Sequence, residues 1–76
     1  MESMPFLHAN KIFAITFEDD LPFFIVRSIL DQLLDKNAFD SESEQFGESY
    51  HLTCDTEEFK VWVVKMEVII LRESLS

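Results

Sequence analysis

Between residues 20 and 36, apolar side chains recur every three or four positions, which is the spacing of one face of an α-helix. This apolar stripe consists of Phe23, Val26, Ile29, Leu30, Leu33 and Leu34. Asp19 or Asp20 is suited to cap the first turn, which also tolerates a proline at Pro22. The pattern therefore predicts an amphipathic helix over residues 20–36. Phe24 lies on the flank of the stripe, so we expect it either to pack against a loop or to contact a partner.

Residues 11–18 ("KIFAITFE") have the pattern of a β-strand. Phe13, Ile15 and Phe17 share one side of this strand, and we expect that side to meet the core. Residues 48–54 are also rich in strand-forming side chains. The "DTEE" that follows them is suited to close a hairpin with the next run of apolar residues.

The run from residue 59 to residue 73 is interpreted as one long strand, because it holds a cluster of β-branched side chains. Helical spacing also fits residues 66–75, and the sequence leaves this alternative open. Apolar side chains occupy both sides of the run, so either both sides are covered within the chain or another molecule covers one of them. The side expected to support self-association carries Trp62, Val64, Met66, Val68 and Ile70.

These elements predict an α+β fold: a small β-α-β-β domain in which one amphipathic helix packs on an antiparallel-rich sheet. Residues 1–10 are interpreted as a lead-in, and residues 1–76 as a single small acidic domain. A core of this size supplies only roughly 3–5 kcal/mol, and the single cysteine, Cys54, cannot form a disulfide within the chain. We therefore expect a second copy, as in a homodimer, or a partner chain to add stability.

The sequence also indicates the cellular compartment in which we expect the protein. A lone cysteine is typical of a reducing compartment. The N-terminal residues lack the basic segment and apolar run of a signal peptide. The most apolar segment, residues 61–71, is too short to span a bilayer and is interrupted by Lys65 and Glu67. We therefore expect a cytoplasmic protein with no membrane partner.

The formal net charge of −9 points to a basic protein as the partner. Direct binding of nucleic acid or of anionic membranes is not expected, because both need Lys and Arg side chains against phosphates. No Lys or Arg lies between Lys36 and Lys60. Together with Phe24, the acids of this stretch are the expected partner-binding residues: Asp40, Glu42, Glu44, Glu48, Asp55, Glu57 and Glu58. The alternative is that this acidic stretch only keeps the protein soluble.

The sequence offers little for catalysis or for cofactor binding. One glycine in 76 residues excludes glycine-rich nucleotide loops and the P-loop. His51 and Cys54 are three positions apart, which on a strand places them on opposite faces, so we expect no metal site. A calcium loop beginning at Asp40 fails at Gln45 and His51, where Gly and Glu are needed. Neighbours along a strand are also poorly placed as a nucleophile and its base, so we expect neither an enzyme nor a cofactor.

Two functions remain as hypotheses. The first is a non-catalytic, acidic protein-binding module of the inhibitor or immunity type, which occupies a basic surface of a partner. Nuclease inhibitors and phage-encoded anti-defence inhibitors that mimic nucleic acid follow this physical logic, although the sequence carries no family motif. The alternative is a small accessory subunit or chaperone-like dimer that joins a partner by strand addition through its C-terminal strand.

Overall fold

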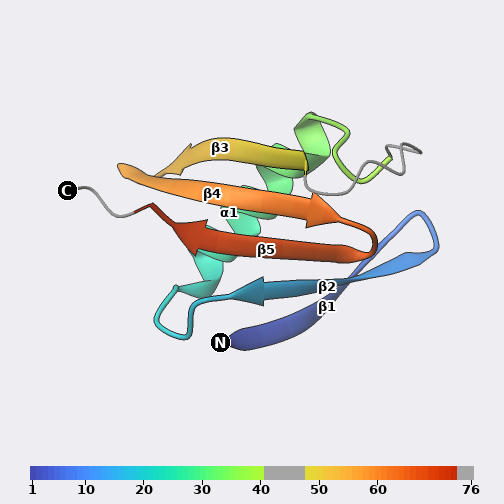
Figure 1. The fold of residues 1–76 in the computed structure, drawn as a ribbon, viewed down its shortest axis with the longest axis horizontal. Helices are drawn as coiled ribbons and strands as arrows, with labels where there is room; N and C mark the ends of the chain where they lie inside the picture. The colour runs from blue at the N-terminus through green and yellow to red at the C-terminus, as the bar shows by residue number, and fades with distance from the viewer. Residues whose placement is uncertain (41–47, 74–76) are drawn as a thin grey trace.

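A five-stranded sheet covered on one face by a helix forms the described part of the chain, residues 1–40 and 48–73 of the computed structural model (Figure 1). The elements in chain order are β1 (Glu2–His8), β2 (Lys11–Phe17), α1 (Phe23–Asp35), β3 (Glu48–Cys54), β4 (Glu57–Val64) and β5 (Glu67–Arg72). This arrangement confirms the predicted α+β class, with one helix on a sheet. Its β-β-α-β-β-β order contains two more strands than the sequence predicted.

The strands lie side by side in the order β1-β2-β5-β4-β3, so the last strand of the chain is the central one. β2 and β5 are parallel, and the other three pairings are antiparallel, in agreement with the predicted antiparallel-rich sheet. Because β3 is antiparallel to β4, and β4 to β5, the strands β2, β5 and β3 all end at the same end of the sheet. The candidate functional site lies at this shared end of the sheet.

The core lies between α1 and the sheet face that the helix covers. The apolar stripe of α1 is buried as predicted at Val26, Ile29, Leu30 and Leu33, and Ile25 joins it. Opposite the helix, the sheet contributes its buried apolar side chains: Phe13, Ile15, Phe17, Leu52, Phe59, Val61, Val68 and Ile70. The predicted core side of residues 11–18 is thereby confirmed.

The start of the helix differs from the prediction. α1 begins at Phe23, its N-cap position is Pro22, and no side chain caps it. Asp19 and Asp20 make ion pairs elsewhere, so they are not the predicted caps. Leu21 fills the core at this point, and Phe23, which was predicted to extend the apolar stripe, is instead 62% exposed.

The predicted lead-in is the edge strand β1. Its residues alternate, with Met4, Phe6 and His8 partly buried and the residues between them exposed. Pro5 obscured this pattern, but an edge strand accommodates proline because one side of its backbone needs no ladder bonds. Ala9 and Asn10 both have positive φ and form the two-residue turn into β2, the geometry that suits a tight hairpin.

The predicted long C-terminal strand is a hairpin, because a turn at Lys65–Met66 separates β4 from β5. The turn changes which residues share a face, so Val68 and Ile70 enter the core and are fully buried. These two residues therefore cannot form the predicted self-association surface. The helical alternative for residues 66–75 is wrong as far as Arg72, where β5 ends, and residues 74–75 lie outside the described residues.

Candidate functional site: the acidic end of the sheet

Carboxylates gather where β2, β3 and β5 end and where β1 and β4 begin. The topology brings together three segments far apart in the sequence: the loop after β2, the β3–β4 turn and the residue after β5. We call this surface the acidic end. It consists of Glu2, Glu18, Asp19, Asp20, Asp55, Glu57, Glu58 and Glu73. In Figure 1 it is the left-hand end of the sheet, where β2, β3 and β5 end.

Arg72, at the end of β5, holds three of these carboxylates. Its Nε donates to Oε2 of Glu57 at 2.7 Å, and its Nη1 donates to Oδ2 of Asp20 at 2.9 Å. Glu18 lies 3.7 Å from Nη1 and also accepts the backbone N–H of Arg72 at 2.9 Å. The hydrogen bonds to Asp20 and then to Glu57 raise the pKa of Arg72 above its ordinary value. Arg72 therefore stays charged and ties the loop after β2 to β4 and β5.

Two other nitrogen-containing groups meet the acidic end. The N-terminal ammonium group lies 3.1 Å from Oδ1 of Asp19. The ring of His51 lies between two carboxylates, with Nε2 at 3.3 Å from Glu58 and Nδ1 at 3.2 Å from Glu73. Even with these pairs, carboxylates outnumber cations at this surface, so it remains strongly acidic.

Two exposed phenylalanines stand beside the acidic end. Phe23 and Phe24 open α1 directly after the loop that carries Glu18, Asp19 and Asp20, and they are 62% and 63% exposed. Phe24 is thus accessible, as one of the two sequence-based alternatives for it requires. Exposed aromatic side chains beside charges are typical anchors of protein interfaces.

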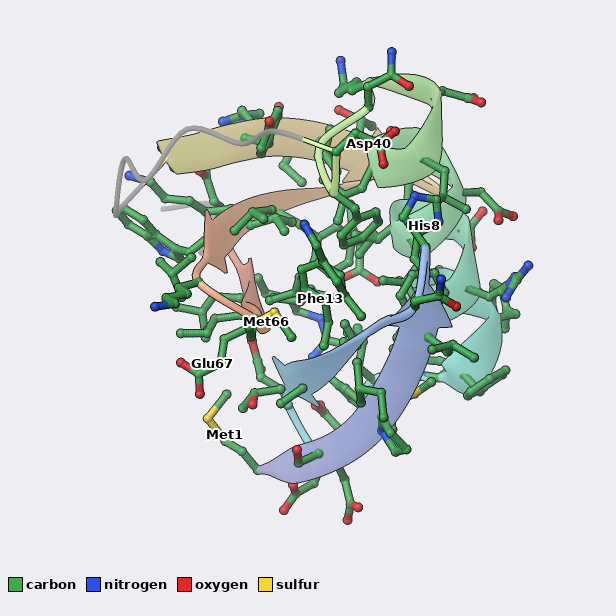
Figure 2. All side chains as sticks on the ribbon, turned by 90° about the vertical axis from the view of Figure 1, so that its right-hand side faces the viewer. Met1, His8, Phe13, Asp40, Met66 and Glu67 are labelled. Carbon is green, nitrogen blue, oxygen red and sulfur yellow. The ribbon has the colours of Figure 1, made fainter. Side chains whose placement is uncertain are left out.

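The sheet face away from α1 is a second exposed surface, which Figure 1 shows toward the viewer. We call it the open face. Its apolar side chains are Leu7, Ile12, Ala14, Trp62, Val64, Ile69 and Leu71, with Met66 in the adjoining turn. Pro5, Ile12, Ala14 and Met66 line part of a shallow depression of about 300 Å³. In Figure 2, Met66 and Glu67 lie on this side of the molecule, away from α1.

The structure separates the acidic stretch that the sequence analysis treated as one surface. Asp55, Glu57 and Glu58 belong to the acidic end. Asp40 follows α1 at the opposite end of the sheet, where its Oδ1 lies 2.9 Å from Nε2 of His8 (Figure 2). The side chain of Glu48 lies outside the described residues, as do the expected partner-binding residues Glu42 and Glu44.

Sequence reasoning missed five members of the acidic end, at Glu2, Glu18, Asp19, Asp20 and Glu73. The "EDD" before α1 was interpreted as a helix-capping signal, Glu2 begins a strand that was not predicted, and Glu73 follows a strand whose neighbours were unknown. The sequence did contain a signal for Glu18, Asp19 and Asp20, because a helix cap needs only one acid and a run of three indicates a charged surface.

The self-association residues are also distributed differently from the prediction. Trp62 and Val64 lie half-buried on the open face, and Met66 lies exposed in the turn that ends β4. The Nζ of Lys60 lies 5.0 Å from the centre of the Trp62 ring, so a cation covers part of this aromatic surface.

The described residues bring few other reactive groups together. Cys54 is buried on the core side of β3, whereas His51 is exposed on the open face, as the strand geometry predicted.

In residues 1–40 and 48–73, no helix has the length and apolar character needed to cross a membrane. No protein-family model, curated protein or solved structure matches the chain.

Proposed function

We propose that the protein is a non-catalytic acidic binding module whose acidic end occupies a basic surface of a partner protein. The observation that supports this function best is the convergence of carboxylates from three distant chain segments on one end of the sheet. Like charges held together repel one another, which costs folding free energy. A basic partner surface removes that cost on binding and is attracted over a distance comparable with the Debye length.

The partner class follows from this chemistry. Proteins that bind nucleic acid present Lys and Arg side chains to phosphates, so they offer the basic surface that the acidic end matches. Phe23 and Phe24 add apolar area beside the charges, which would favour a protein partner over a mobile counterion. The proposed role is therefore inhibition of such a protein, in the manner of immunity proteins and of inhibitors encoded by phages or other mobile elements.

The test compares two isosteric triple variants that remove the same amount of charge. The first, Glu2→Gln, Asp19→Asn and Asp55→Asn, removes three charges from the acidic end and leaves the carboxylates on Arg72 in place. The control, Asp31→Asn, Asp35→Asn and Glu67→Gln, neutralises exposed acids elsewhere.

The immobilised protein captures binding proteins from a cell lysate at low and high salt, and the association rate of a captured protein is then measured with each variant. We expect the acidic-end variant to associate several-fold more slowly at low salt and the control to approach the wild-type rate. If both variants associate more slowly than the wild type by the same factor, only net charge matters, and the acidic end has no special role.

A second candidate function is that of an assembling subunit, and the apolar open face is the observation that favours it. Strand addition through the C-terminal strand cannot be the mode, because β5 is hydrogen-bonded on both sides. The free edges are β1, where Pro5 lacks an N–H, and β3, where the Thr53 carbonyl accepts a hydrogen bond from Nε2 of Gln32 at 3.1 Å. A subunit of this kind would therefore assemble through the open face. The oligomeric state of the protein tests this candidate.

A further inference from the structure

Three adjacent strands place potential metal ligands at one point on the open face. His51 lies on β3, Glu58 lies on β4, and Glu73 is the residue that follows β5. The backbone N–H of Glu73 donates to the carbonyl of Glu58 at 2.9 Å, which holds these two residues side by side. His51 is paired across the ladder with Lys60, so it lies diagonally opposite Glu58 on the same face.

We propose that His51, Glu58 and Glu73 form a binding site for a divalent first-row transition metal ion of the zinc class. The donor set would be one imidazole nitrogen and two carboxylate oxygens, which are ordinary zinc ligands. One ligand atom from each residue lies within 4.8 Å of the others. Ligand atoms around a zinc ion are roughly 3–3.5 Å apart, given zinc–ligand bonds of about 2.0–2.2 Å. To complete the site, one carboxylate would turn from its own ring nitrogen of His51 toward the ring nitrogen that binds the ion, and water would fill the open position.

The environment of His51 differs from that of His8, the other histidine of the chain. His8 meets a single carboxylate, Asp40, and packs against the ring of Phe39 at 5.7 Å between centroids. His51 meets a carboxylate at each ring nitrogen. Two carboxylates drawn to one imidazole repel each other, and a dication between them would offset this repulsion.

The same donor set favours zinc-like ions over Mg²⁺ and Ca²⁺. The latter are hard cations that prefer sites made of oxygen ligands, whereas imidazole nitrogen suits Zn²⁺, Cu²⁺ and Ni²⁺.

A bound ion would link β3 to β4 and to the residue after β5. The ligands converge only in the folded chain, so binding would stabilise the fold. This inference does not rest on the proposed partner binding, because the site needs only the chain itself.

The experiment titrates Zn²⁺ into protein that has been treated with EDTA and desalted, with isothermal calorimetry and the melting temperature as readouts. We expect one Zn²⁺ per chain and a higher melting temperature at saturation. His51→Gln should weaken Zn²⁺ affinity on the order of 100-fold, because loss of even an outer-shell group costs 10–100-fold. His8→Gln is the matched control and should bind Zn²⁺ as the wild type does. Cys54→Ser should also bind normally, because the thiol is not a ligand.

Several outcomes would overturn the proposal. These are an absence of Zn²⁺ binding by the wild type, unchanged affinity in His51→Gln, or an equal loss in His8→Gln or Cys54→Ser. Equal stabilisation by Mg²⁺ would show a mere charge effect. Because His51 is exposed, its replacement should leave the fold intact, and the circular dichroism spectrum of the metal-free variant checks this. Glu73→Gln provides a second variant, for which we expect weaker Zn²⁺ binding and an unchanged fold.

Discussion

Several turn residues adopt a backbone conformation that glycine or asparagine usually occupies. Positive φ is found at Ala9, Asn10, Asp55, Thr56 and Met66, all of them in the two-residue turns between strands. For an L-residue with a Cβ, this left-handed region costs roughly 1–2 kcal/mol. The strain is greatest for a β-branched side chain, which makes Thr56, with φ of 68°, the most strained of these positions.

Thr56→Gly should therefore stabilise the protein. Glycine removes the left-handed strain but adds freedom to the unfolded chain, so the expected gain in the free energy of unfolding is about 0.5–1 kcal/mol. Denaturant unfolding measures it. Ala9→Gly is the control and should gain less, because alanine, with φ of 50°, carries no β-branched side chain. A loss of stability in Thr56→Gly would show that the threonine side chain makes a contact that outweighs its strain.

Arg72 leads to a second prediction at this scale. Arg72→Gln leaves Glu18, Asp20 and Glu57 close together without their shared cation, so the melting temperature should fall. Because the lost interactions are electrostatic, the difference from the wild type should shrink as salt is raised from low to molar concentrations. The reference is Arg27→Gln, which removes only the helix-surface pair with Asp31 at 3.4 Å and should change the melting temperature little. Equal effects of the two substitutions would show that the Arg72 cluster is not structural.

Elements with strong periodicity were predictable from sequence. The stripe of α1 and the core side of β2 both follow from spacing alone, because each packs one face against the core. β1 was missed because Pro5 interrupts its strand pattern. The break between β4 and β5 was missed because Lys65–Met66 has none of the glycine or asparagine that usually marks a tight turn.

The acidic end was largely unpredictable for a different reason. It depends on β2 and β5 lying side by side in parallel, and no local pattern encodes the pairing of strands that are separated by a helix and two other strands. The parallel pairing is what sets Asp20 beside Arg72. Glu57 and Glu58 lie on this surface, although the sequence analysis assigned them to a continuous acidic stretch, and their role in partner binding stays a prediction.

The helix face allows a direct test at the element scale. Leu30→Ala should lower the free energy of unfolding by roughly 2–5 kcal/mol, because Leu30 is fully buried and the substitution leaves a cavity. Asp31→Ala, one residue further on the exposed side, should change it by less than about 0.5 kcal/mol. Urea unfolding of the two variants measures the difference. Similar losses in both would mean that the helix is rotated relative to the sheet.

For the whole molecule, the unequal surfaces of the sheet lead to a prediction about assembly. One face is covered by α1, while the open face exposes Leu7, Ile12 and Leu71 to solvent. If the protein is the assembling subunit of the second candidate function, it should sediment as a dimer at high concentration. Raised salt should strengthen this dimer, because it screens the repulsion between two chains of net charge −9.

Ile12→Lys should then yield a monomer that is still folded, because this side chain is 61% exposed in the single chain. Asp35→Lys, on the helix layer, changes the charge further and should leave the dimer intact. A wild-type protein that sediments as a monomer at all concentrations would remove the second candidate function and leave the acidic binding module.

The central position of β5 has a consequence for how the chain reaches its fold. The β1–β2 hairpin and the β3–β4 hairpin share no strand pairing, and β5 alone is bonded to both. During synthesis, β2 and β4 therefore have unpaired edges until residues 67–72 have emerged. Such edges are templates for pairing with other chains, so this interval is when the nascent protein is most exposed to aggregation. A protease that cuts the Lys65–Met66 turn and releases β5 would likewise dismantle the whole sheet.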